Sequence, residues 1–332
     1  MTETVLESGK LPAALLRRLL APFKKDTPEL LLPPSVGEDA GVIGIGGGAL
    51  VTATDPITMT GNEVGGHAVL INANDVAVLG VRPRWFLAVF LLPVGTTVSE
   101  VEGIFENMRQ TLEALDIVLV GGHTEVTDAV NQPVVTGQML GFQTNGHFVK
   151  TGGVRPGDKI LQIGPAPVEG AAVVALELGT QLSLPDSLLA EARDAILNPG
   201  IAVIEPALRS AALGASAMHD PTEGGLSAGL HELAEASSVA LEVRASATLW
   251  YGPGIALCEA VGADPWGMLA SGTLLAAFPS DRVDEAANVL VRDGNDVALL
   301  AIAEAGEGVR FDDGRSLPRY ERDELSRILA GA

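Results

Sequence analysis

Apolar residues recur at helical spacing in three places in the first third of the chain. The pattern over Leu11 to Leu20 predicts an amphipathic helix, and Asn62 to Leu79 predicts a second, more apolar one. A third helix is expected over Val101 to Leu112, and Ser99 can cap its start. Pro22 to Pro34 is a proline-punctuated connector between the first helix and the strands that follow.

Shorter apolar runs predict strands. Ala40–Ile45 and Leu50–Thr54 flank three glycines at 46–48, which predicts a β-hairpin. Asp55-Pro56 should end its second strand, because proline cannot donate a hydrogen bond to the ladder. Trp85 to Leu92 is apolar at every position, so both faces of that strand should be covered.

Two further strand regions precede Lys150. Ile117–Val120 predicts a strand that leads into Gly121-Gly122. Val134 to Phe142 and Phe148-Val149 predict a hairpin turned at Asn145-Gly146.

The pattern of predicted elements changes after Lys150. Two glycine- and proline-containing stretches, Thr151–Gly153 and Arg155–Asp158, predict a boundary between a domain of residues 1–150 and a domain of residues 151–332. Strands beyond it alternate with helical segments, which predicts α/β layering and leaves strand order open. These predicted strands are Lys159–Ile163, Ala215–Met218, Ala240–Val243, Thr273–Ala277 and Asp296–Ile302.

Length and composition narrow the class of protein. The 332 residues exceed the roughly 250–300 at which a single core stops growing, so two domains are expected. The net charge of −21, without a run of Lys or Arg, argues against nucleic acid as a partner. It is compatible with a ligand that arrives with divalent cations. No run of about 18 apolar residues and no secretory leader are present, so we expect a cytoplasmic protein with no membrane association.

Several familiar signatures fail. Gly44–Ala49 fits the letters of a dinucleotide fingerprint, but a strand pattern follows it where a helix is required, so a hairpin turn is favoured. No complete P-loop is present; Ser8-Gly9-Lys10 matches only its tail, although Lys10 could still meet a phosphate. The single cysteine, Cys258, excludes a disulfide within the chain and a cysteine-based zinc cluster, and it is expected in the core.

Acidic residues stand where predicted elements end. These are Glu38-Asp39, Asp55, Asp75 next to Asn74, Glu125, and Asp220 before a helix that starts near Glu223. Carboxylates beside glycine and hydroxyl residues suit Mg²⁺ that bridges nucleotide phosphates. Thr222, Gly224 and Gly225 at the helix start would add N–H donors for an anion.

Purely structural roles remain possible for several of these residues in place of metal or phosphate binding. Asp55 and Asp220 could be turn or cap residues, and His123 and His67 are expected as a loop and a helix-surface histidine. Asp75 is different, since a carboxylate within an apolar helix needs a partner or a metal.

Five ordered motifs carry a family resemblance. They are Val36–Ile43, Thr54–Thr58, Asn72–Ala77, Gly121–Val126 and Asp220–Gly225. Together they resemble the aminoimidazole-ribonucleotide synthetase superfamily, and most closely its hydrogenase-maturation branch. Thiamine-monophosphate kinase and selenophosphate synthetase belong to the same superfamily.

The resemblance implies a fold and a reaction. The expected fold is a two-domain α+β and α/β chain, with an N-terminal mixed sheet that forms a β-barrel in a homodimer and a C-terminal α/β sandwich. ATP and Mg²⁺ are expected between the domains, where ATP would phosphorylate an oxygen of a small-molecule or peptide-borne acceptor.

The resemblance also implies roles for single residues. The metal-binding acids would be Asp39, Asp55, Asp75 and Asp220, and the catalytic residues Asp75, Asp220 and His123. The cofactor-binding residues would be Lys10, Asp39, Asn74, Gly121, Gly122, Thr124, Thr222, Gly224 and Gly225.

Two departures leave alternatives. Relatives often carry aspartate at the position of His123, and the hydrogenase-maturation enzyme acts on a C-terminal cysteine that this chain lacks. A second hypothesis is therefore a nucleotide-binding maturation partner protein with little turnover, and a third is a kinase like thiamine-monophosphate kinase. Apolar strands in a small sheet also predict a homodimer through residues 40–145.

Overall fold

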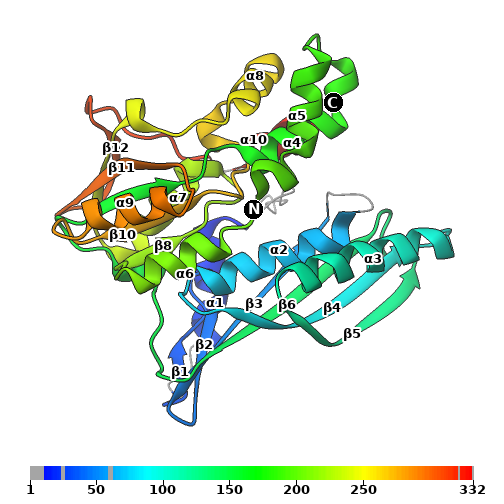
Figure 1. The fold of residues 1–332 in the computed structure, drawn as a ribbon, viewed down its shortest axis with the longest axis horizontal. Coiled ribbons are helices and arrows are strands. Elements are labelled where there is room, and N and C mark those ends of the chain that lie inside the picture. Colours follow the sequence, from blue (N-terminus) through cyan, green and yellow to red (C-terminus); the bar gives the residue numbers. More distant parts are fainter. Residues whose placement is uncertain (1–10, 24–26, 59–62, 321, 331–332) are drawn as a thin grey trace, which may run out of the picture.

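The computed structural model describes residues 11–23, 27–58, 63–320 and 322–330, so Lys10 lies outside the described residues. The chain forms two six-stranded mixed sheets with helices packed against them (Figure 1). The first sheet uses strands from residues 30–143 and the second uses strands from residues 159–311. The prediction of a two-domain fold with mixed sheets is confirmed at this level.

The first sheet has the order β1-β2-β3-β6-β4-β5. Only β4 and β5 pair in parallel; the other neighbours are antiparallel. The strands are β1 (Leu30–Leu32), β2 (Gly41–Ile45), β3 (Gly48–Ile57), β4 (Pro83–Pro93), β5 (Val118–Thr127) and β6 (Val134–Gln143). β1 was not predicted, because three leucines inside the proline-punctuated connector show no strand periodicity.

The predicted end of the second hairpin strand is wrong. β3 continues through Asp55 and Pro56, which pair with Gly137 and Thr136 of β6. β2 accompanies β3 only as far as Thr52, so beyond that point one side of β3 has no neighbour among the described strands. Proline is tolerated there, since the N–H it lacks would have had no partner strand.

Helices α2 (Val64–Ala77) and α3 (Val98–Ala114) cover one face of the first sheet, while α1 (Ala13–Leu20) confirms the first predicted helix (Figure 1). The predicted cap of α3 is wrong. Thr97, not Ser99, is the last extended residue, and it forms a capping box with Glu100.

No described segment of the single chain covers the opposite face of the first sheet. Along β4, Phe86 and Phe90 are buried, while Val89 between them is exposed. β5 is an edge strand whose Val118 and Val120 are exposed. The prediction that both faces of the Trp85–Leu92 strand are covered therefore fails within one chain. Among the described strands, neither sheet closes into a barrel by itself.

The second sheet has the order β12-β9-β11-β7-β10-β8, with only β12 and β9 parallel. Its strands are β7 (Lys159–Ile163), β8 (Ala217–His219), β9 (Ala240–Val243), β10 (Leu274–Phe278), β11 (Val297–Glu304) and β12 (Gly308–Phe311). All five predicted strands are present, and β12 was missed. The predicted Phe148-Val149 strand does not form, since the Val149 N–H donates to the carbonyl of Leu79.

Helices enclose the second sheet on both faces. α7 (Gly225–Ser237) packs Leu226, Leu230 and Leu233 on one face, and α6 (Ile204–Ala212) and α9 (Val283–Arg292) pack on the other. A further layer holds α4 (Val168–Glu177), α5 (Asp186–Asp194), α8 (Gly252–Val261) and α10 (Glu324–Leu329), with Cys258 buried in its core as predicted. None of the described helices combines the length and apolar composition needed to cross a bilayer.

One stripe of α2 joins the two halves. His67, Ile71 and Asn74 follow each other at intervals of four and three residues, so they share a helix face. Ile71 packs with the α4 layer, and the Asn74 amide donates to the Ile201 carbonyl (2.8 Å) while its oxygen accepts from the Val203 N–H (2.9 Å). These contacts fix the position of α2 relative to the second half of the chain.

We expect Asn74→Ala to lower the free energy of unfolding by about 2–3 kcal/mol, because it leaves a buried carbonyl and a buried N–H without partners. Urea unfolding followed by circular dichroism measures the change. Asn131→Ala, at an exposed position, should stay within about 0.5 kcal/mol of wild type. Equal stability of the two variants would contradict the joining role of Asn74.

Candidate metal and nucleotide site

Three side chains from both halves meet in one acidic cluster. Asp39 lies in the loop before β2, His219 is the last residue of β8, and Asp220 follows it. Each offers a ligand atom, and these atoms lie within 4.8 Å of one another. The His219 Nδ1 is 2.9 Å from an Asp39 carboxylate oxygen, and its Nε2 is 2.8 Å from the Glu232 Oε2.

The donor chemistry of this cluster fits a hard cation. Both carboxylate oxygens of Asp220 are buried and have no hydrogen-bond partner among the described residues. Both nitrogens of His219 are already used by Asp39 and Glu232, so His219 orients carboxylates and leaves oxygen atoms as the free donors. Oxygen donors of this kind suit Mg²⁺.

Burial and like charges act on the cluster together. Burial raises the pKa of Asp220 well above its usual value, the charges of Asp39 and Asp55 raise it further, and His219 opposes them. Burial works against protonation of His219, but Asp39 and Glu232 raise its pKa well above the usual value. The imidazolium is thus the positive charge that allows the carboxylates to approach, and a divalent cation would complete the neutralisation.

Asp55 of β3 is close enough to the cluster for its charge to raise the pKa of Asp220, and Asp75 lies on α2. The Asn72 side chain of α2 accepts from the Asp55 N–H (2.8 Å) and donates to its carbonyl (3.2 Å). A Cβ on Gly137, which pairs with Asp55, would lie 2.4 Å from the Asn72 amide nitrogen, so glycine permits this contact. Asp75 is buried one turn beyond Asn72 on the same helix. Most of the other buried residues of α2 are apolar, so the metal-binding role of Asp75 stays a prediction.

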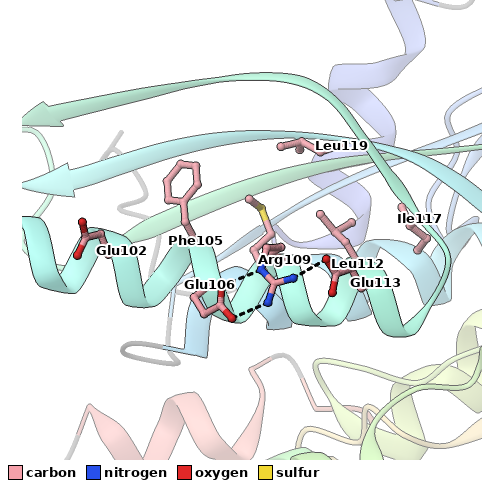
Figure 2. Close-up of a pocket in the computed structure, with 9 residues that line it drawn as sticks. Glu102, Phe105, Glu106, Arg109, Leu112, Glu113, Ile117 and Leu119 are labelled. Carbon is pink, nitrogen blue, oxygen red and sulfur yellow. Dashed lines mark hydrogen bonds and ion pairs between the residues drawn. The ribbon is translucent and has the colours of Figure 1, made fainter.

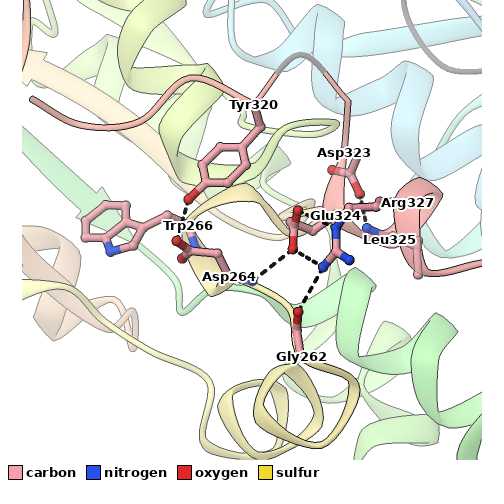
Figure 3. Close-up of polar contacts among 8 residues, drawn as sticks. All are labelled: Gly262, Asp264, Trp266, Tyr320, Asp323, Glu324, Leu325 and Arg327. Carbon is pink, nitrogen blue, oxygen red and sulfur yellow. Dashed lines mark hydrogen bonds and ion pairs between the residues drawn. The ribbon is translucent and has the colours of Figure 1, made fainter.

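The predicted anion site at the start of α7 is partly filled by the chain itself. The Gly224 N–H donates to the Asp323 carboxylate (2.6 Å), which also accepts from the Leu325 N–H (2.7 Å; Figure 3). Burial raises the pKa of Asp323 to about 6. The Thr222 carbonyl accepts from the N–H groups of Gly225 and Ala270.

The glycine-rich motif with His123 lies elsewhere in the single chain. Gly121, Gly122, His123 and Thr124 are exposed on β5, and His123 contacts Glu125 at 3.2 Å. Strand register places Gly122 in the same row as Asp55, three strand spacings or about 14 Å away. The predicted loop around His123 is therefore an edge strand, and within one chain His123 does not join the acidic cluster.

Several residues of the site were missed. His219, Glu232 and Thr151 carried no predicted role, yet Thr151 contacts Asp39 and Glu38, and Glu38 was only one of the acids noted at the ends of predicted elements. Only the position of His219 next to Asp220 could have pointed to it. The interpretation of His67 as a helix-surface histidine is wrong: it is buried against Glu169.

A hollow of about 650 Å³ lies away from the acidic cluster, between α3 and β5 (Figure 2). Phe105, Met108, Leu112 and Leu119 form its apolar floor, and Arg109 is held at its rim by Glu106 and Glu113. It contains none of the clustered acids, so we do not assign the nucleotide to it.

Comparison with known proteins identifies the class. The profile of the AIR synthase related protein N-terminal domain matches residues 37–143, and that of the C-terminal domain matches residues 155–314. The chain belongs to the AIR synthase-related family. The predicted resemblance is confirmed, and with it the expectation of an enzyme of this superfamily.

The similar proteins come from two branches of this family, HypE and ThiL. The chain is 27% identical over 296 residues to carbamoyl dehydratase HypE of Azotobacter vinelandii, covering 85% of this chain and 84% of the relative. It resembles a chain of the crystal structure of a HypE–HypF complex with a TM-score of 0.76 at 20% identity, covering 93% and 100% of the two chains. Thiamine-monophosphate kinase ThiL of Aquifex aeolicus, complexed with AMPPCP and TMP, gives a TM-score of 0.72 at 21% identity, with 93% and 94% covered.

We expect Asp220→Asn to stabilise the metal-free protein and to remove its response to Mg²⁺. A carboxylate whose folded pKa is raised costs stability increasingly as the pH rises above its unfolded value, so at pH 7.5 the amide should gain of the order of 1–3 kcal/mol. Thermal unfolding in EDTA and in Mg²⁺ measures both effects. Asp312→Asn, at an exposed position, should behave as wild type, and loss of stability in Asp220→Asn would refute the charge argument.

Proposed function

We propose that this protein binds Mg-ATP between its two halves and uses it to phosphorylate the oxygen of a carbamoyl-type amide. The observation that carries the proposal is the pair of buried Asp220 oxygens, which have no hydrogen-bond partner in the described part of the chain and lie beside Asp39 and His219. A bound divalent cation would supply charge neutralisation for the phosphate groups. Sequence relatives support the acceptor, since several of them are named carbamoyl dehydratase HypE.

Different residues of the chain would bind the cations and orient the carboxylates. Asp39, Asp55, Asp75 and Asp220 would hold the cations, and His219 would keep the Asp39 carboxylate turned toward Asp220. The nucleotide complex of a structural neighbour supports binding of a triphosphate by this fold. The proposed domains remain residues 1–150 and 151–332, with the first contributing three of these acids and the second contributing Asp220.

A nucleotide-binding partner protein is the second candidate. Two observations favour it: His123 lies on an exposed edge outside the cluster, and one solved structure of this fold is a HypE–HypF complex. Mg-ATP binding in calorimetry without turnover, together with a stable complex in a pulldown, would establish it in place of the first.

We expect Asp75→Asn to lower the rate of Mg-ATP turnover by about 10²–10³-fold, because a metal-binding oxygen is replaced by a weaker neutral donor. ADP release is measured with Mg²⁺, ATP and either a carbamoylated cysteine peptide or thiamine monophosphate. Asp312→Asn is the control. Turnover of Asp75→Asn at the wild-type rate would show that the metal assignment is wrong, and turnover of thiamine monophosphate alone would favour a kinase of the ThiL kind.

We also propose that two chains pair through the open face and β5 edge of the first sheet. This face exposes Val89, Val118 and Val120, and an unpaired apolar edge strand is unfavourable in water. A second copy related by a two-fold axis would cover it, and would bring the His123 motif into a shared interface.

We expect light scattering at micromolar concentration to give twice the monomer mass of 34.2 kDa. Val120→Lys should shift the protein toward monomer, since it places a charge on the proposed interface. Val291→Lys is a matched control, because Val120 and Val291 are 52% and 54% exposed but Val291 lies on α9. A wild-type mass of 34.2 kDa would contradict the dimer.

A further inference from the structure

A second polar cluster joins the two halves away from the acidic site. His67 in the first turn of α2 and Glu169 in the first turn of α4 lie 102 residues apart in sequence. The distance between the His67 Nε2 and the Glu169 Oε1 is 2.7 Å. Their side chains are only 1% and 9% exposed.

Packing alone does not explain these residue types. Val64, Ala68, Val168 and Ala172 surround the same turns of α2 and α4 and are buried and apolar. A buried ionisable pair is often no more stabilising than well-packed apolar side chains, because desolvation offsets the attraction. Holding the halves together therefore does not by itself explain why these two positions carry ionisable side chains.

The imidazole has one nitrogen left over. Its Nδ1 is buried and has no hydrogen-bond partner among the described residues. Burial opposes ionisation of Glu169, but His67 and the nearby Ser271 hydroxyl lower the pKa of Glu169, so its carboxylate can accept the Nε2–H. A carboxylate that holds one ring nitrogen and leaves the other free is the arrangement of a general base and its orienting group.

The segment 269–271 and helix α2 each connect this pair to the acidic site. The Gly170 N–H of α4 donates to the Leu269 carbonyl (3.0 Å), and the next residue, Ala270, donates its N–H to the Thr222 carbonyl (3.2 Å). The segment 269–271 thus links the turn that bears Glu169 to the motif that bears Asp220. On the other side, α2 bears His67 and Asn72, whose side chain holds the Asp55 backbone.

We propose that His67 is the general base for the acceptor amide and that Glu169 is its positioning residue, an inference that rests on the proposed function. The amide N–H donates to the free Nδ1 and loses its proton to it. The carbonyl oxygen then forms a bond to the γ-phosphorus of ATP as the bond from that phosphorus to the β–γ bridging oxygen breaks. The products are an O-phosphorylated imidate, ADP and a proton held on His67.

The first experiment compares His67→Gln and Glu169→Gln with wild type in turnover of Mg-ATP with a carbamoylated cysteine peptide. His67→Gln keeps a donor for Glu169 but accepts no proton, so kcat should fall by about 10²–10⁴-fold. Glu169→Gln should lower kcat by about tenfold or more, with the KM for ATP unchanged in both variants. His147→Gln, an exposed histidine, is the matched control. Wild-type kcat in His67→Gln, or a change confined to KM, would overturn the proposal.

The second experiment needs no turnover and uses the wild-type chain. Ring nitrogen resonances of the five histidines are recorded by ¹⁵N NMR with Mg²⁺ and AMPPCP, before and after acetamide is added as a simple primary amide. The Nδ1 resonance of His67, assigned by its loss in His67→Gln or His67→Asn, should shift on addition of acetamide. An unmoved resonance would overturn the base assignment even if the enzyme turns over. A shift in a protein without turnover would instead count against the proposed function and leave the amide site standing.

Discussion

A single buried imidazole allows the rest of the acidic site to exist. His219 contacts Asp39 on one nitrogen and Glu232 on the other, and Asp220 follows it in the chain. Without a positive charge between them, carboxylates this close and this buried would repel each other strongly. The contact also requires both halves of the chain, because Asp39 precedes the first hairpin and His219 ends a strand of the second sheet. The charge balance of the site therefore depends on how the two sheets are placed relative to each other.

Helix α2 is the second support of that arrangement. It is buried on nearly every side, and three of its buried polar residues hold other segments of the chain. Asn72 holds the Asp55 backbone, Asn74 bonds to the segment at residues 201–203, and His67 meets Glu169. A helix with such neighbours cannot rotate or slide without leaving several buried polar groups unpaired, which is costly. The same rigidity gives proposed catalytic groups on α2 a fixed position relative to the acids on the strands.

The open face of the first sheet sets a different demand. Alternate residues of β4 are buried under α2 and α3, and the residues between them face outward together with β5. The strand is apolar on both faces, so its sequence suits a setting in which the second face is also covered. For this reason the apolar run Trp85–Leu92, which shows no polar alternation, predicted burial of both faces of the strand. In the single chain only one of these faces is buried.

Periodicity and motif order by themselves determined most of the elements and the list of acids. All five predicted strands of the second half, the hairpin predicted from Ala40–Ile45 and Leu50–Thr54, and the apolar helix bearing Asp75 follow from patterns within a few residues, which local sterics and side-chain alternation control. The continuation of β3 through Pro56 was decided by its pairing with β6, and proline is tolerated because no described strand neighbours the other side of β3 beyond Thr52. Likewise only the tertiary structure could bring His219 to Asp39 and His67 to Glu169, 180 and 102 residues apart, because burial and charge pairing depend on which distant segments pack together. The sequence thus determined which acidic residues are available for the site, and the packing of the two sheets against α2 determined which distant residues contact them.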